Sequence, residues 1–347
     1  MESVELLQIE PTTRCNYTCG FCAGRYMEQS DLPFERFAAA LDSYPGIRHI
    51  ELQGEGEPLL HPRFLDMMAL ARQRGIKVSF ITNGSLLSDA VIERILELAP
   101  EKFYVSMESA NPELFQQIRG GKLDKVIRGL EALMAQRRSR GQARPAVGLA
   151  VTVMKRTRQE MPAIRGLYER LGLDGGISVQ ALQTMDAYAQ HYGEDLQTQL
   201  LSDAEKQELM IRAKSGAVLR SPIVGFYETL FWRWKPTLRR CPWLDRGLYV
   251  NFQGAITPCC MVKDAERFAL GRLGETPPAQ VLERRAALRD ELASGAMPTP
   301  CQGCTIAQFA LMNRRQYAQF RLARLRLRRS SPPQSASAKV SLPVIKS

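Results

Sequence analysis

The chain has 347 residues, of which 45% are hydrophobic and 24% charged, and its formal net charge is +11. A chain of this length can bury a large core as one domain or two. No apolar run approaches the roughly 18 residues that a membrane-spanning helix needs. The first ten residues are acidic and alternating, unlike a signal peptide. We therefore expect a cytoplasmic protein, in which clustered cysteines more often serve metal or redox chemistry than disulfides.

The excess positive charge is concentrated at the C-terminus. Residues 314–347 hold seven Arg and two Lys without any Asp or Glu, so the rest of the chain is close to neutral. Because Ser and Pro accompany these charges, we interpret residues 313–347 as a basic, disordered tail. The body lacks a motif that combines aromatic and basic residues, so we expect no specific nucleic-acid partner.

Short strand-like runs alternate with helical segments over residues 1–185. The predicted strands cover residues 4–10, 47–54, 76–84, 102–109, 146–154 and 176–182. Parallel strands need crossover connections, so this alternation predicts a parallel α/β sheet. Either an open doubly wound sheet or an incomplete (β/α) barrel satisfies the pattern. In both folds the loops that follow the strands meet at one mouth, where chemistry collects.

Three of the eight cysteines follow the first predicted strand. Cys15, Cys19 and Cys22 form the spacing C-x3-C-x2-C, which supplies three ligands and leaves a fourth position open. An open site on a soft, sulfur-ligated metal indicates an iron–sulfur cluster with one free iron. The alternative is a zinc site completed by histidine, but the chain has only three histidines.

This motif, with the aromatic Phe21 before its last cysteine, resembles the radical S-adenosylmethionine (SAM) superfamily. The resemblance implies a partial (β/α)6 TIM-like barrel in which the three cysteines hold a [4Fe–4S] cluster and SAM occupies the open iron. In that family, reductive cleavage of SAM gives a 5′-deoxyadenosyl radical that abstracts hydrogen from a substrate. A low-potential donor such as flavodoxin or ferredoxin is implied as the electron source.

The resemblance continues through the loops after the next strands. "GEGEP" at residues 54–58 resembles the motif that contacts the SAM amino group, which implies this role for Gly56 and Glu57. Glu55 departs from the family, where glycine is more usual. The resemblance further implies cofactor-binding roles for Phe21, Asn83 and Ser106, and a catalytic, substrate-facing role for Glu108.

Residues 186–240 are predicted to form a helical linker, and residues 241–312 hold the remaining cysteines. Cys241, Cys259, Cys301 and Cys304 form C-x17-C…C-x2-C. This spacing resembles the SPASM or twitch extension and implies a small C-terminal domain with one auxiliary [4Fe–4S] cluster. A four-cysteine zinc ribbon is the competing interpretation. Cys260 is either a small buried hydrophobe or a catalytic thiol.

The resemblance predicts an enzyme that abstracts hydrogen from a small metabolite, such as an amino sugar, cyclitol or nucleoside-like compound. The auxiliary cluster would oxidise this substrate by accepting an electron. The first cysteine lies only 15 residues into the chain, which favours a small metabolite over a peptide. The alternatives are a peptide-modifying maturase or epimerase, and a zinc-stabilised binding module without enzymatic activity.

Overall fold

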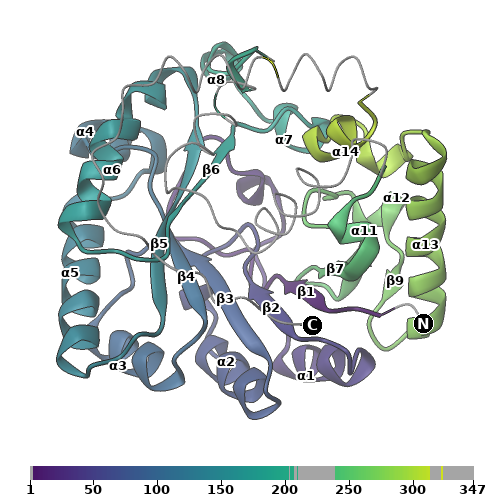
Figure 1. Ribbon diagram of the computed structural model, residues 1–347, viewed down its shortest axis with the longest axis horizontal. Helices are drawn as coiled ribbons and strands as arrows, with labels where there is room; N and C mark the ends of the chain where they lie inside the picture. The colour runs from purple at the N-terminus through teal and green to yellow at the C-terminus, as the bar shows by residue number, and fades with distance from the viewer. Residues whose placement is uncertain (1–2, 203, 207–208, 210–238, 313–321, 323–347) are drawn as a thin grey trace.

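The computed structural model describes residues 3–202, 204–206, 209, 239–312 and 322. Its centre is a sheet in which the first six strands are parallel and lie side by side in chain order (Figure 1). These strands are β1 (Leu6–Ile9), β2 (His49–Leu52), β3 (Lys77–Thr82), β4 (Lys102–Ser106), β5 (Ala146–Val153) and β6 (Ile177–Ala181). All six predicted strands are confirmed, and their sequential order is that of a partial barrel, not of a doubly wound sheet.

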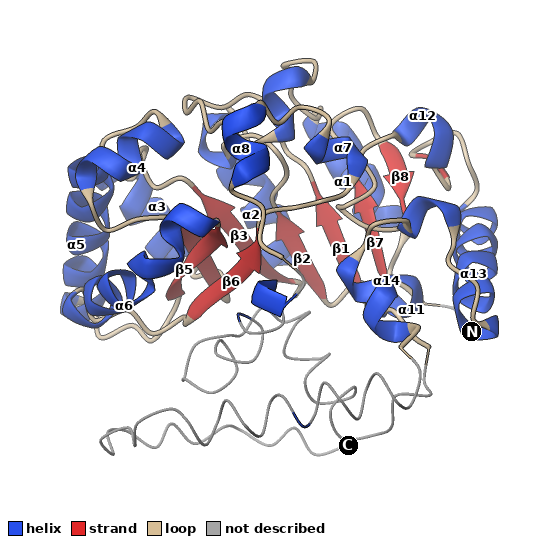
Figure 2. Ribbon diagram, turned by 90° about the horizontal axis from the view of Figure 1, so that it is seen from above, coloured by secondary structure: helices blue, strands red, loops and turns tan. Residues whose placement is uncertain are grey.

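Helices connect the parallel strands and cover their outer side (Figure 2). They are α1 (Phe34–Ser43), α2 (Phe64–Gln73), α3 (Asp89–Leu98), α4 (Pro112–Arg119), α5 (Leu123–Ser139) and α6 (Met161–Arg170). The Ser88 hydroxyl caps α3 by accepting a hydrogen bond from Val91 N–H. Gly75 follows α2 with a φ of +71°, a left-handed conformation that suits glycine best.

Alternation along the strands separates two chemically different faces. In β1, Leu7 and Ile9 are fully buried in the hydrophobic core, whereas Gln8 and the following Glu10 lie on the opposite side. In β2, Ile50 and Leu52 pack into the core while Glu51 faces the other way. The outer face of the sheet therefore packs on the helices, and the inner face is polar.

The C-terminal region extends this same sheet. Strand β7 (Gly247–Val250) pairs in parallel with β1, and β8 (Ala255–Thr257) and β9 (Gly271–Arg272) continue it antiparallel. The helices of this region are α11 (Pro242–Arg246), α12 (Ala265–Phe268), α13 (Pro278–Ser294) and α14 (Thr305–Ala310). Pairing of β7 with β1 places the second group of cysteines beside the first strand of the barrel.

The segment after β6 contains two short helices, α7 (Asp186–Ala189) and α8 (Glu194–Thr198), in the described part of the predicted linker. Gly193 begins α8 as its N-cap and interrupts what the sequence indicates as a continuous helical stretch. Residues 210–238 of the linker lie outside the described residues, as does the basic tail apart from Leu322. Within the described part of the chain, no helix is long and apolar enough to cross a membrane.

Candidate active site

The loop that carries the first three cysteines leaves the carboxyl end of β1 and is closed at its neck. Thr12 and Asp31 form an antiparallel bridge across the base of the loop. The Arg14 guanidinium donates to both carboxylate oxygens of Asp31, at 3.0 and 2.6 Å, and to the carbonyl oxygen of Leu60 at 3.0 Å. These contacts hold the loop against the segment that follows β2, at the mouth of the barrel.

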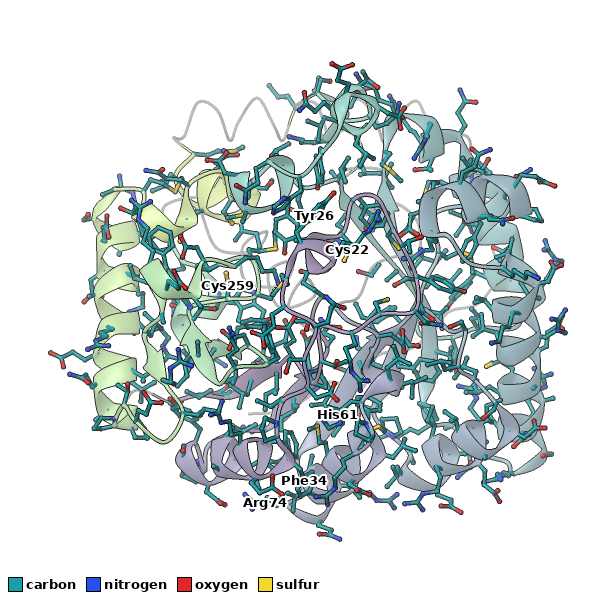
Figure 3. All side chains as sticks on the ribbon, turned by 180° about the vertical axis from the view of Figure 1, so that it is seen from behind. Cys22, Tyr26, Phe34, His61, Arg74 and Cys259 are labelled. Atoms are coloured by element: carbon teal, nitrogen blue, oxygen red, sulfur yellow. The ribbon has the colours of Figure 1, made fainter. Side chains whose placement is uncertain are left out.

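The three thiols of this loop have different neighbours. A backbone amide of the loop lies 3.4 Å from Cys15 Sγ. Cys19 Sγ lies 3.7 Å from Nη1 of Arg119, and Cys22 Sγ lies 3.5 Å from both the carbonyl and the carboxylate of Glu55. In Figure 3, Cys22 lies in the central loop, which faces the C-terminal region that carries Cys259.

The chemistry of these thiols fits an iron–sulfur cluster. Burial raises the pKa of Cys19 to about 11, and burial together with the Glu55 carboxylate raises the pKa of Cys22 further. A cysteine binds a metal as a thiolate, so these buried thiols need a bound positive charge to stabilise their ionised form. No group of three or more His, Cys, Asp or Glu among the residues that the structure describes is placed to hold a single metal ion. The three thiols of one loop match in number the cysteine ligands of a [4Fe–4S] cluster that keeps one iron open.

Gly56 and Glu57 tie the loop after β2 to its neighbours. A Cβ atom at Gly56 would collide with the Thr12 carbonyl oxygen and lie 2.7 Å from that of Arg14, so only glycine fits there. The buried Glu57 carboxylate accepts hydrogen bonds from the Thr82 hydroxyl at 2.7 Å and from the Asn83 amide at 2.6 Å. Burial raises the pKa of Glu57 to about 7.

The other predicted cofactor contacts lie around the same mouth. Asn83 Nδ2 donates to Asn16 Oδ1 at 2.8 Å and lies 3.9 Å from Cys15 Sγ. Phe21 is partly buried between the barrel core and the side chains around α7. Ser106 is the last residue of β4 and is also partly buried. The structure thus brings Asn83 to the cysteine loop, of which Phe21 is itself a part, while Ser106 lies on β4.

Glu108 is engaged by a residue that the sequence gives no reason to single out. Its two carboxylate oxygens pair with Nε and Nη2 of Arg119, and Oε1 also accepts from the Thr152 amide at 3.3 Å. Both side chains of the pair are buried: that of Glu108 is 1% exposed and that of Arg119 is 7% exposed. Although burial opposes it, the charges of Glu108 and Cys19 raise the pKa of Arg119 above its usual value. Glu108 thereby orients a permanent cation toward the cluster motif.

The second group of cysteines gathers in a hydrophobic cluster of the C-terminal region. Cys241 precedes α11, Cys259 follows β8, and Cys301 and Cys304 flank a turn before α14. All four belong to this cluster. Burial raises the pKa of Cys301 to about 12, with further contributions from Cys241 and Cys304. Four thiols in one hydrophobic cluster match in number the four ligands of a closed [4Fe–4S] cluster.

The adjacent cysteines Cys259 and Cys260 have different charged neighbours. Burial raises the pKa of Cys259, and the charges of Cys260, Cys241 and Cys304 raise it further. For Cys260, burial raises the pKa to about 12, and the charges that act next are Lys263, Glu51 and Glu55. Both thiols pack against the same hydrophobic cluster, and Cys260 in addition lies near charged groups of the barrel mouth.

A buried ion pair links the barrel to the C-terminal region. Lys263 Nζ lies 2.7 Å from Glu55 Oε1, which also accepts from the Tyr188 hydroxyl at 3.1 Å. Burial alone would raise the pKa of Glu55, but the Lys263 ammonium and these hydrogen bonds hold it below its usual value. The Glu55 amide donates to Glu10 Oε1 at 2.8 Å. Sequence analysis missed this cluster; its only signals were the glutamate in place of glycine and a lysine four residues after Cys259.

The inner face of the sheet supplies further polar groups. His49 Nε2 lies 2.7 Å from Ser79 Oγ, and Gln53 Nε2 donates to Glu51 Oε2 at 3.3 Å. Burial lowers the pKa of His49 to about 4 and raises that of Glu51 to about 7. Lys102 on β4 acts on both groups. This face is suited to hydrogen-bonding groups, not to an apolar ligand.

Two family models match the chain. Residues 9–161 match the model of the radical SAM superfamily, and residues 241–305 match that of SPASM, an iron–sulfur cluster-binding domain. The first match runs from the last residue of β1 through β5 and includes the cysteine loop, and the second contains all four auxiliary cysteines. The competing zinc interpretations of both cysteine groups, and with them the non-enzymatic binding module, are not supported.

Curated relatives match about half of the chain. The chain is 30% identical over 180 residues to a tungsten-containing aldehyde ferredoxin oxidoreductase cofactor-modifying protein of Pyrococcus furiosus, which covers 49% of this chain and 50% of that protein. It is 26% identical over 173 residues to an AdoMet-dependent heme synthase of Methanosarcina barkeri, with 48% of each chain covered. The chain thus spans about half the length of these relatives.

Solved structures share the fold over most of the chain. SuiB of Streptococcus suis bound to S-adenosylmethionine superposes with a TM-score of 0.64 at 14% identity, covering 89% of this chain and 72% of that one. The protein anSMEcpe with bound AdoMet and Cp18Cys peptide superposes with a TM-score of 0.62 at 16% identity, covering 93% and 96%. At these identities the likeness establishes the architecture.

Proposed function

The chain is a radical SAM enzyme with a SPASM iron–sulfur domain, and from this premise we propose that it oxidises a small polar metabolite held between its two cysteine groups. Cys15, Cys19 and Cys22 would hold the SAM-binding cluster, and Cys241, Cys259, Cys301 and Cys304 the auxiliary one. When bound, the first cluster and SAM supply a 5′-deoxyadenosyl radical for hydrogen abstraction, and the second cluster supplies an electron acceptor.

The observation that carries this proposal is the continuity between the two cysteine groups. Glu55 contacts Cys22 and pairs with Lys263, which follows Cys259 by four residues. One ion pair therefore bridges the radical-generating side and the auxiliary side of the site. A substrate bound at this junction lies between both groups, as net oxidation requires.

The inner face of the sheet supports a small polar substrate. Gln8, Glu51, Ser79 and Lys102 all belong to its strands, and a ligand rich in hydroxyl or amino groups would match their hydrogen-bonding capacity. Within this proposal Phe21, Gly56, Glu57, Asn83 and Ser106 bind SAM. Glu108 acts as a positioning residue through Arg119, in place of the catalytic role that the sequence analysis gave it.

A peptide substrate is the second candidate. Two solved structures with this fold carry bound peptides, the precursor peptide SuiA in SuiB and the Cp18Cys peptide in anSMEcpe. Cys260 adds a thiol on the substrate side, which would serve as a hydrogen-atom donor if the reaction were an epimerisation. Oxidation and epimerisation are separated by the fate of the hydrogen atom at the reacting carbon.

The electron source is proposed to be a low-potential flavodoxin or ferredoxin, with the enzyme working in the reducing cytoplasm. All eight cysteines are free thiols, as two thiolate-ligated clusters require before assembly. Reduction of the reconstituted protein by a purified flavodoxin system, followed by 5′-deoxyadenosine formation, tests this partner.

The function is tested by removing two auxiliary ligands. A Cys301→Ala, Cys304→Ala variant should still form 5′-deoxyadenosine from SAM but should release no oxidised product from a substrate that the wild-type protein turns over. Chromatography with mass detection measures both products in one sample. Equal amounts of oxidised product from variant and wild type would contradict the proposed electron acceptor.

A further inference from the structure

The junction between the barrel and the C-terminal region contains buried hydrogen-bonding groups without partners. Tyr249, on β7, is 1% exposed, and its hydroxyl has no hydrogen-bond partner among the residues that the structure describes. Tyr192 is 5% exposed, and its hydroxyl also has no hydrogen-bond partner among the described residues. A buried polar atom is normally paired, so such groups point to a ligand that completes them.

Lys263 also retains hydrogen-bonding capacity. Its ammonium group has three N–H donors. Among the described residues, Glu55 is the one carboxylate that forms an ion pair with it. Its Nζ lies 5.1 Å from the centroid of the Tyr249 ring and 5.9 Å from that of Tyr188. The ammonium group of Lys263 therefore lies near two aromatic rings with donors to spare, and one of these rings carries the unpaired Tyr249 hydroxyl.

The charges around this position determine what kind of ligand fits. The Lys263 charge is already balanced by Glu55, and Glu10 lies next to them with its pKa raised by burial. An added carboxylate would face Glu55 and Glu10, and an added ammonium group would face Lys263. A neutral group that both donates and accepts hydrogen bonds meets neither penalty.

We propose that Lys263 and Tyr249 bind hydroxyl groups of a neutral, polyhydroxylated substrate, with Glu55 and Tyr188 holding the lysine in position. This inference rests on the proposed function and assigns the substrate class to its site. Lys263 and the Tyr249 hydroxyl would donate to substrate oxygens, and the Tyr249 oxygen would accept in return. Because Glu55 also contacts Cys22, a hydroxyl-bearing carbon bound here lies beside the radical-generating motif.

The site can be tested with three six-membered-ring probes that differ in charge. Calorimetry on the anaerobic, reconstituted protein with SAM bound would compare myo-inositol, cyclohexanecarboxylate and cyclohexylammonium. We expect myo-inositol to bind more tightly than either charged probe. Tyr249→Phe removes one oxygen atom and should weaken myo-inositol binding about tenfold. Tyr44→Phe, which removes the hydroxyl of a largely buried tyrosine directly after α1, is the matched control and should bind like the wild type.

A second variant keeps the test independent of folding. Glu55→Gln with Lys263→Met removes both charges without stranding either, and iron content reports whether the protein is assembled. It should also weaken myo-inositol binding about tenfold or more. Tighter binding of a charged probe, no myo-inositol binding, or unchanged binding in Tyr249→Phe would overturn the inference. So would a loss of SAM affinity in Tyr249→Phe, because the hydroxyl would then belong to the SAM site.

These outcomes are distinguishable from failure of the proposed function. A wild-type protein that cleaves SAM but shows no preference for the neutral probe contradicts the substrate class alone. A wild-type protein that forms no 5′-deoxyadenosine contradicts the proposed function, whatever the probes show.

Discussion

Arg119 connects Glu108 to the cluster motif: its guanidinium pairs through two nitrogen atoms with the Glu108 carboxylate and lies 3.7 Å from Cys19 Sγ. Neighbouring charge and hydrogen bonds to the sulfur atoms set the potential of an iron–sulfur cluster. Arg119→Met should therefore lower the reduction potential of the SAM-binding cluster. Glu108→Gln, which removes a negative charge, should raise it. Potentiometric titration followed by electron paramagnetic resonance measures both, and shifts of the same sign would contradict the account.

The same pair contributes to stability. Arg119→Met leaves the buried Glu108 carboxylate uncompensated, which should cost about 3 to 5 kcal/mol of unfolding free energy. Combining Arg119→Met with Glu108→Leu should recover most of this loss, since no charge is then stranded. Denaturant titrations of the two variants give the comparison, and an equal loss in both would show that the pair is not the cause.

Glu57 should affect both folding and SAM binding. Its carboxylate accepts hydrogen bonds from Leu59, Thr82 and Asn83, so Glu57→Gln turns an amide donor toward other donors. We expect a loss of about 1 to 3 kcal/mol of unfolding free energy and weaker SAM binding. Glu113→Gln, an exposed carboxylate in the first turn of α4, is the control. SAM affinity equal to that of the wild type in calorimetry would remove Glu57 from the SAM site.

Glu51 should make stability depend on pH. Burial raises its pKa from the usual 4.5 to about 7, so the folded protein holds the proton more tightly than the unfolded chain. The stabilising contribution of the protonated Glu51 side chain is complete below pH 4.5 and is lost as pH rises through 7. Glu51→Gln removes the cost of burying the ionised carboxylate. The variant should therefore gain about 2 to 3 kcal/mol more unfolding free energy, relative to the wild type, at pH 8 than at pH 4.5. Thermal unfolding at both values tests this, and an identical shift at both would refute it.

Iron content tests the two cysteine groups separately. The reconstituted protein should hold about eight irons per chain, and replacement of Cys15, Cys19 and Cys22 by Ala should leave about half. Iron and sulfide assays with the visible absorption spectrum provide the measurement. Stoichiometric zinc without charge-transfer absorption would contradict the assignment of both groups.

The barrel could be predicted from the sequence because its strands are buried and read as short apolar runs between helices. The cysteine spacing likewise marked both metal-binding groups. The contacts across the site could not be predicted in this way. Lys263 meets Glu55 only because β7 pairs with β1, a register that no local pattern encodes. Arg119 ends α4 as an ordinary basic residue, and its role depends on the loop that packs against it.

The fate of the abstracted hydrogen tests the central claim most directly. For any substrate that the enzyme turns over, oxidation leaves no solvent hydrogen at the reacting carbon, and one SAM is consumed per product. Turnover in deuterated water, analysed by mass spectrometry and NMR, should therefore give an oxidised product without deuterium at that carbon. Deuterium incorporated there, and abolished by Cys260→Ser, would contradict oxidation and identify an epimerase with Cys260 as its hydrogen donor.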